Sequence, residues 1–218
     1  MRKVLFFVVC ILFLLAGGAQ ADFSADLYLG GNFNNNIPLI VGGSPVSDGG
    51  GSIYQSTLNQ VNLPWVYCVG RTTTVVVPGD YGNTYVTTTG QVYDNGFGGP
   101  TSLNPVPYAG QVAWLLGTYA SSTGVDQVAL QAAIWHEVDS NVSLSSSSSS
   151  WSNYQAYLAA LGTNTGDITQ FLWLSPSQDG SNFYQGLVTL NTVPIPSAIW
   201  LLGSGLMGLA GIRRRLRK

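Results

Sequence analysis

The segment LQAAIW, residues 130–135, is the most informative one for the fold. It lies within residues 126–138, whose apolar spacing predicts a helix opened by a capping box at 123–126. Three of the four helical neighbours of Gln131 are apolar, the four being Gln127, Val128, Ile134 and Trp135. The Gln131 amide is therefore expected on the core side of the helix. Burying an unpaired amide costs roughly 2–7 kcal/mol, so this amide either finds hydrogen-bond partners or has been changed chemically.

Two more helices are predicted around this one. Apolar residues recur at helical spacing over residues 109–120. A third helix is expected over residues 152–161, where Gly162 stops it. The serine run at 145–150 is typical of a linker or a loop tip.

Strand patterns flank the helical part on both sides. Alternating β-branched residues predict strands over residues 65–78 and 84–93, and closing strands over 171–174 and 183–190. Residues 30–51 are rich in Gly, Asn and Ser and are expected to form a loop. Strands lead, helices follow and strands return, which predicts an α+β fold: a β-rich sheet or barrel with an inserted subdomain of about three helices.

The charge distribution and the aromatic content each exclude one class of protein. Apart from Arg71, every Lys and Arg lies before residue 4 or after residue 212. Residues 22–193 thus carry one base and ten acids, a charge of −9, and contain no lysine. A nucleic-acid partner is excluded because phosphate binding needs a basic surface. Six Trp, eleven Tyr and eight Phe exclude a disordered chain, and roughly 170 residues suffice for one domain.

The N-terminus has the three parts of a secretory signal peptide, residues 1–21. Arg2 and Lys3 precede an apolar run, and the segment ends in Ala19-Gln20-Ala21. Cleavage after Ala21 removes Cys10 with the signal, whereas the alternative is an uncleaved membrane anchor. If residues 1–21 are a cleaved signal peptide, the exported chain keeps a single cysteine.

The C-terminus, residues 193–218, combines three features. These are Pro194-Ile195-Pro196, an uncharged run over residues 195–212 that can just span a bilayer as a helix, and the cluster Arg213, Arg214 and Arg215. This layout resembles a PEP-CTERM sorting signal, with Ile in place of the usual Glu between the prolines. The resemblance implies a Gram-negative protein that is exported through the inner membrane, anchored there transiently by this helix and processed by an exosortase. Its destination would be the cell surface or a biofilm exopolysaccharide matrix; the alternative is an ordinary tail anchor.

Cys68 is the one cysteine left after signal removal, in the apolar segment 65–69. It can be an inert core thiol, an intermolecular disulfide partner, a nucleophile or part of another covalent bond. One His and one Cys do not make a zinc site, and no phosphate-binding glycine loop occurs, so no metal or cofactor is expected.

Taken together, Tyr67-Cys68 and the later Gln-x-Ala-Ile-Trp motif over 131–135 resemble the thioester (TQXA) domains of bacterial surface adhesins. The resemblance covers roughly residues 55–190, after a lead-in at 22–54. Leu130 stands where the family name has Thr, and Gly70 stands where an Asp is common. The resemblance implies an internal thioester between Cys68 and Gln131, formed with loss of ammonia. An amine or hydroxyl of a partner would then open it in a single covalent attachment, without enzymatic turnover.

The chemistry of a thioester agrees with the composition of the chain. Trp65, Tyr67, Ile134 and Trp135 are expected to keep water away, and the lysine-free body offers no internal ε-amine. His136, the only histidine, is either a proton carrier for this chemistry or a residue of the helix surface. Two further interpretations remain: a structural matrix protein with an inert Cys68, and a hydrolase that uses Cys68 and His136.

Overall fold

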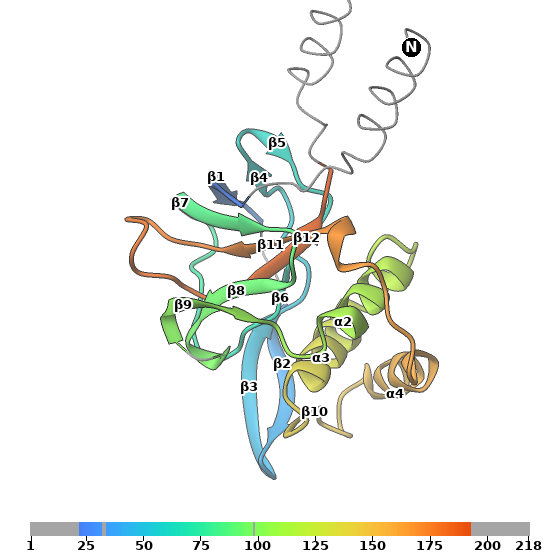
Figure 1. Cartoon of the computed structure of the whole chain (residues 1–218). Helices are drawn as coiled ribbons and strands as arrows, with labels where there is room; N and C mark the ends of the chain where they lie inside the picture. Colours follow the sequence, from blue (N-terminus) through green and yellow to red (C-terminus); the bar gives the residue numbers. More distant parts are fainter. Residues whose placement is uncertain (1–21, 32–33, 98, 193–218) are drawn as a thin grey trace, which may run out of the picture.

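The protein has a mixed α+β fold, as the sequence predicted. The computed structural model describes residues 22–31, 34–97 and 99–192. Most of this chain is antiparallel sheet, the largest sheet curls into a half-barrel, and three helices lie against one end of it (Figure 1). The predicted signal peptide and the sorting signal, with Pro194, Pro196, Arg213, Arg214 and Arg215, lie outside the described residues.

The large sheet has seven strands, and β6 lies at one of its edges. In spatial order they are β5 (Val61–Asn62), β4 (Thr57–Leu58), β1 (Phe23–Leu29), β7 (Gly79–Thr87), β11 (Phe171–Ser175), β12 (Leu187–Leu190) and β6 (Tyr67–Cys68). All five residues of β11 are buried, as expected of a central strand covered on both faces. On β6, Cys68 pairs with Leu187 of β12, so only one side of β6 has a strand partner in this sheet.

A hairpin occupies residues that were expected to form a loop. β2 (Asn34–Val41) and β3 (Ser44–Gly50) pair with each other, and β2 also pairs with β10 (Val142–Leu144). The loop prediction for residues 30–51 is therefore wrong. Gly42 and Gly43, both at positive φ, form the two-residue turn, and the buried alternation of Ile37 and Leu39 was obscured by the Gly- and Asn-rich composition.

The predicted lead-in, residues 22–54, contributes to the same core as the rest of the chain. Its strand β1 pairs with β7, and Leu27 and Leu29 are fully buried. A two-stranded sheet of β8 (Gln91–Asp94) and β9 (Gly99–Pro105) flanks the half-barrel. The buried core runs from Ala25 to Val188, so a chain of residues 22–192 contains all of it.

The strand predictions were confirmed only in part. β11 matches residues 171–174, and β7 with β8 matches 84–93. Of residues 65–78, however, only Tyr67–Cys68 forms a strand, and residues 183–190 form a strand only from Leu187. β-branched residues favour an extended backbone, but a strand also needs a neighbouring strand as its hydrogen-bond partner. Val76 belongs to no strand of the described sheets, and its side chain is 67% exposed.

All three predicted helices are present. They are α2 (Ala109–Leu115, continued by the π-helix Leu116–Ala120), α3 (Gln127–Val138) and α4 (Trp151–Leu161). Gly162 ends α4 at φ 48°. The predicted capping box is wrong, because Asp126 is itself the N-cap of α3 and its side chain accepts the N–H of Ala129 at 3.0 Å.

Helix α3 is the centre of the helical part. Every residue from Ala129 to Trp135 is buried, and the helix contacts α2, α4, β2, β6 and β10. Short 3₁₀ turns complete the fold at η1 (Asn95–Phe97) and η3 (Ile168–Gln170). Within the described part of the chain, no helix combines the length and apolarity needed to cross a membrane.

Candidate functional site

The fold brings the side chain of Gln131 against the backbone of Cys68. The two residues are 63 positions apart, and both are buried. Gln131 Oε1 accepts the N–H of Cys68 at 3.0 Å, and Gln131 Nε2 donates to the carbonyl of Cys68 at 2.7 Å. The expectation that this amide faces the core is confirmed, and its hydrogen-bonding needs are met without chemical change.

The reason for this contact is the position of β6 at the sheet edge. In an antiparallel pair, two opposing residues exchange two N–H···O bonds. β12 pairs with one side of β6 through Leu187 and Val188. On the other side, the amide of Gln131 exchanges the same two bonds with Cys68 and thus takes the place of a neighbouring strand.

A second backbone donor reaches the same amide oxygen. The N–H of Gly51, just after β3, points to Gln131 Oε1 at 3.4 Å. The chain approaches closely here because a Cβ on Gly50 would lie 2.8 Å from Gln131 Cγ and 2.7 Å from Trp135 Cη2. Two N–H groups therefore converge on one carbonyl oxygen, an arrangement that stabilises negative charge on that oxygen.

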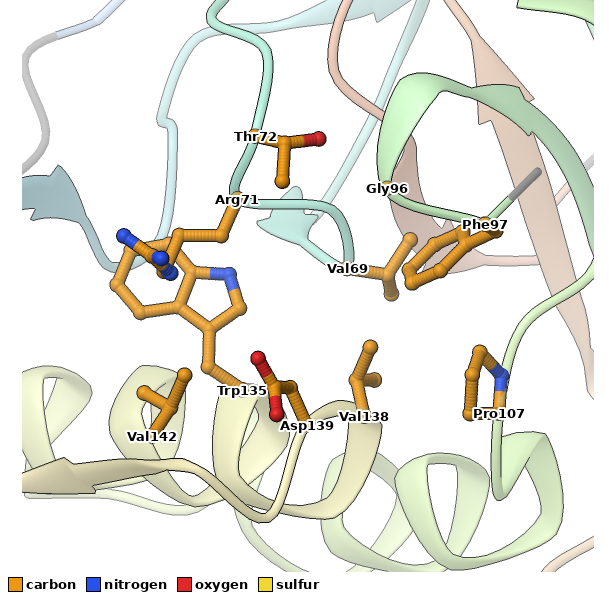
Figure 2. Close-up of a pocket in the computed structure, with 10 residues that line it drawn as sticks. All are labelled: Val69, Arg71, Thr72, Gly96, Phe97, Pro107, Trp135, Val138, Asp139 and Val142. Atoms are coloured by element: carbon orange, nitrogen blue, oxygen red, sulfur yellow. The ribbon is translucent and has the colours of Figure 1, made fainter. Parts of the chain in front are cut away.

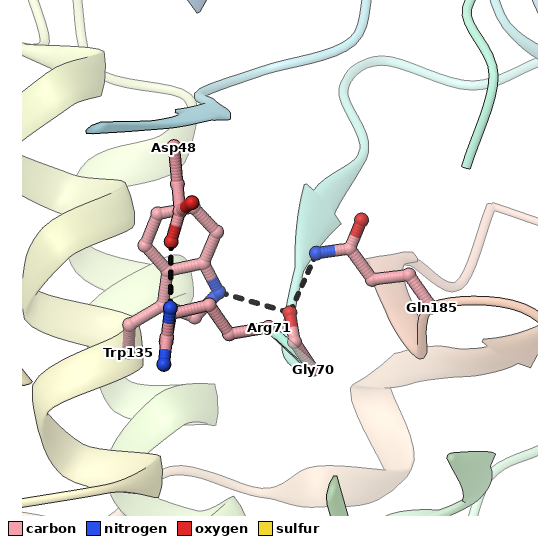
Figure 3. A network of polar contacts seen from close by, with 5 residues as sticks. All are labelled: Asp48, Gly70, Arg71, Trp135 and Gln185. Atoms are coloured by element: carbon pink, nitrogen blue, oxygen red, sulfur yellow. Dashed lines mark hydrogen bonds and ion pairs between the residues drawn. The ribbon is translucent and has the colours of Figure 1, made fainter. Parts of the chain in front are cut away.

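Trp135 ties the segment after Cys68 to α3. Its indole Nε1 donates to the carbonyl of Gly70 at 3.1 Å, and Gln185 Nε2 donates to the same oxygen at 2.6 Å (Figure 3). Arg71 then pairs with Asp48 of β3 at 2.8 Å, which is the sole salt bridge of the described residues. These contacts connect β3, the segment after β6 and α3 next to Cys68 and Gln131.

The four residues expected to keep water away are buried. Trp65, Tyr67, Ile134 and Trp135 are each at most 4% exposed. Cys68 itself is 2% exposed and has no disulfide partner. Water therefore has little direct access to the sulfur or to the amide.

The environment of Cys68 keeps its thiol neutral. Burial, and to a smaller extent the carboxylate of Asp94, raise the pKa of Cys68 to about 12. Asp94 is buried and accepts N–H groups of Gly96 at 2.7 Å and Gly186 at 2.6 Å. A thiol in this setting is a poor nucleophile by itself, because the reactive form is the thiolate.

His136 lies at the C-terminal end of α3 and not in this contact. Its Nδ1 lies 2.6 Å from the carbonyl oxygen of Val142. Because a carbonyl oxygen can only accept a hydrogen bond, Nδ1 carries the proton and donates it to this oxygen. Its ring meets that of Tyr154 edge-on at 6.1 Å. Among the residues that the structure describes, neither Cys68 nor Gln131 hydrogen-bonds to His136.

Several residues of the site could not be predicted from the sequence. Gly50, Gly51 and Asp94 lie in segments with no motif of their own, and only the packing of β3 and β8 brings them close to the Cys68–Gln131 pair or to the Cys68 thiol. In the described ranges, no group of three His, Cys, Asp or Glu is placed to hold a metal ion.

A cavity of about 160 Å³ lies beside this site, with Val69 and Trp135 in its wall (Figure 2).

Compared with known proteins, the chain matches no family model, no curated protein and no solved structure. Its function must therefore be inferred from its own geometry.

Proposed function

We propose that Cys68 and Gln131 form an internal thioester, in a thioester-domain-like fold. The protein would be an exported cell-surface or matrix protein that uses this bond for covalent attachment to an amine or hydroxyl of a partner. The observation that carries this proposal is the amide of Gln131, held against the backbone of Cys68 by hydrogen bonds of 3.0 and 2.7 Å in a buried site.

The forming step uses the Cys68 thiol, the Gln131 amide and two backbone N–H groups. The sulfur of Cys68 attacks Cδ of Gln131, and negative charge develops on Oε1, which faces the N–H groups of Cys68 and Gly51. The thiol proton passes to Nε2 as the C–N bond breaks, and ammonia leaves. One C–S bond replaces one C–N bond, and no oxidant or cofactor is required.

The neutral thiol affects both directions of this chemistry. Formation depends on proximity and on the polarised carbonyl, because little thiolate is present at neutral pH. When a partner's amine opens the thioester, an amide forms and Cys68 returns to its protonated thiol.

The mass of the intact protein tests the proposal. A chain of residues 22–192 should be one ammonia lighter than its sequence mass, and methylamine should add to it and expose one alkylatable thiol. Cys68→Ala and Gln131→Ala should each abolish both effects. Gln127→Ala, one turn earlier on α3, is the matched control and should retain them. Full sequence mass in the untreated wild type would contradict the proposal.

A structural matrix protein is the second candidate, and one observation favours it. The Gln131 amide already has hydrogen-bond partners for its oxygen and its nitrogen, so the fold is complete without a covalent bond. Under this alternative Cys68 is a small apolar core residue. Full sequence mass and a thiol that reacts only after unfolding would support it.

A cysteine hydrolase has less support. Such enzymes need a thiolate and a neighbouring base, whereas burial keeps the Cys68 thiol protonated and His136 is engaged by Val142. Multiple turnovers on ester or amide substrates, lost in Cys68→Ala, would be the result that favours it.

We also propose that residues 1–21 direct export and that residues 193–218 form an exosortase-processed PEP-CTERM signal of a Gram-negative cell. The basis is the sequence pattern alone, with Pro194, Pro196 and the cluster Arg213, Arg214 and Arg215. Replacing the three arginines by glutamine should retain the protein in the inner-membrane fraction. Unchanged release to the surface would contradict this assignment.

A further inference from the structure

The hairpin of β4 and β5 continues outward as a ladder of paired backbone that opens at Gln131. The register of the β4–β5 pairs is kept further out, where the N–H of Ile53 donates to the carbonyl of Val66 at 2.8 Å. Two residues further on, the same register places Gly51 opposite Cys68. In the described part of the chain, no backbone hydrogen bond joins these two residues, and both of their N–H groups point to Gln131 Oε1 instead, at 3.4 and 3.0 Å. The Gln131 amide therefore lies in the gap where the ladder opens.

On the β3 side, the cover of this gap consists of backbone without side chains. Residues 49–51 are three consecutive glycines at the end of β3. A Cβ on Gly50 would lie 2.8 Å from Gln131 Cγ, so the glycine backbone packs directly on that side chain. β3 is an edge strand of its sheet, and its hairpin with β2 projects from the half-barrel (Figure 1). On this side, only main chain covers Gln131.

The pairing of β3 is irregular at the same place. Ile37 pairs with Asp48 and Asn34 with Gly50, and the register shifts between these two pairs. Gly51 follows at φ 108°, a conformation that favours glycine. A bulge interrupts the ladder of hydrogen bonds, so this end of β3 is held less regularly than the rest of the strand.

An ion pair joins the two sides of the gap. The register that places Gly51 opposite Cys68 also places Asp48 opposite Arg71, and these two side chains form a salt bridge at 2.8 Å (Figure 3). Both side chains are partly exposed, Arg71 at 25% and Asp48 at 28%. Arg71 is the only base within residues 22–193, so no other side chain of this part can replace it. The salt bridge thus connects β3 to the segment after β6 three residues beyond the gap.

An acceptor reaches Gln131 only if part of its cover moves, because Gln131 is fully buried and Cys68 is 2% exposed. Moving Trp65, Tyr67 or Trp135 displaces a large buried side chain and loses the apolar surface that it buries. Moving residues 49–51 displaces no side chain of their own and breaks a hydrogen bond of 3.4 Å. The glycine segment is therefore the part of the cover that opens at the lowest cost.

We propose that residues 48–51 form a lid over Gln131 and that the Arg71–Asp48 salt bridge is the latch that holds this lid closed. The lid opens when the end of β3 separates from the segment after β6, and an acceptor then reaches the carbonyl carbon of Gln131. This inference rests on the proposed function for the attack by the acceptor. The opening itself is a property of the fold and requires no thioester.

Opening is measured first, by alkylation of Cys68 in the full chain in detergent, with Cys10→Ala so that Cys68 is its one thiol. Methylamine treatment beforehand leaves Cys68 as a free thiol whether or not a thioester had formed. Arg71→Gln and Asp48→Asn should each raise the rate with iodoacetamide about threefold, as expected for the loss of one partly exposed ion pair. Asp80→Asn, an equal charge change on β7, should leave the rate unchanged.

Two further measurements separate a latched lid from a general loss of stability. Local opening exposes little surface, so the alkylation rates should stay nearly constant up to about 1 M urea. The double variant Asp48→Asn/Arg71→Gln should react no faster than either single variant, because each substitution removes the same ion pair. Additive effects, a steep increase with urea, or rates equal to that of Asp80→Asn would overturn the lid.

The rate of methylamine addition to the untreated protein is measured next. Because opening precedes the attack, Arg71→Gln and Asp48→Asn should raise this rate by the same factor as alkylation. Faster alkylation with an unchanged addition rate would overturn the lid as the route of the acceptor. Faster alkylation in proteins of full sequence mass would support the lid and reject the thioester. Proteins one ammonia lighter with unchanged rates would support the thioester and reject the lid, so the two failures are distinguishable.

Discussion

Cys68→Ala separates a covalent link from a simple core contact by its effect on stability. In the variant, the side-chain amide of Gln131 keeps its two hydrogen bonds to the backbone of residue 68, since only the sulfur is removed. Deleting one buried heavy atom costs about 1 kcal/mol. If a thioester closes the loop of 63 residues, its removal costs about 4 kcal/mol more, treated as a crosslink of the unfolded chain.

The expected loss is therefore about 5 kcal/mol with the thioester and about 1 kcal/mol without it. Guanidinium unfolding of residues 22–192, followed by tryptophan fluorescence, measures this difference. For a chain of this size the same losses lower Tm by about 10–20 °C and about 2–4 °C, respectively. Methylamine provides the chemical control, because it opens the thioester without a mutation and should bring the wild type close to the Cys68→Ala value.

One pair of results would contradict a covalent crosslink between Cys68 and Gln131. If Cys68→Ala costs about 1 kcal/mol and methylamine leaves the wild-type midpoint unchanged, no crosslink joins the two residues. The Cys68–Gln131 contact would then be two hydrogen bonds that complete the edge of the sheet, and the structural interpretation would stand.

Two other predictions concern packing and pH. Gly50→Ala should destabilise the protein by about 1–3 kcal/mol in urea unfolding, because the new Cβ would lie 2.8 Å from Cγ of Gln131. Gly117→Ala is the control and should not destabilise it, because its new Cβ has its nearest contact at 3.9 Å. Equal effects of the two substitutions would contradict the close packing at Gly50. N–H groups of Asn182 and Ser181 hold the pKa of Asp179 well below its usual value, so its stabilising contribution is present above about pH 4 and is lost as the pH falls. Comparing wild type with Asp179→Asn in acid titrations checks this, and a difference that does not shrink below pH 4 would count against it.

Much of the helical part could be predicted because its signals are local. The 3.6-residue period located α2, α3 and α4, and it also placed the Gln131 amide toward the core. The hairpin of β2 and β3 was missed because its Gly, Asn and Ser residues are equally typical of loops. Strand β2 pairs with β3 and also with β10, which lies about one hundred residues later in the chain.

The amino-acid pattern alone shows that residues 22–192 are acidic, contain no lysine and hold one cysteine, and it indicates that Gln131 faces the core. The contact between Gln131 and the backbone of Cys68 is a result of folding, because β6 lies at a sheet edge where that backbone needs a hydrogen-bond partner. The strand order also brings the N–H of Gly51 to the amide oxygen of Gln131 and the carboxylate of Asp94 near the Cys68 thiol. Periodicity encodes which face of an element is buried, but which residues oppose each other across the core is set by the packing of the whole chain.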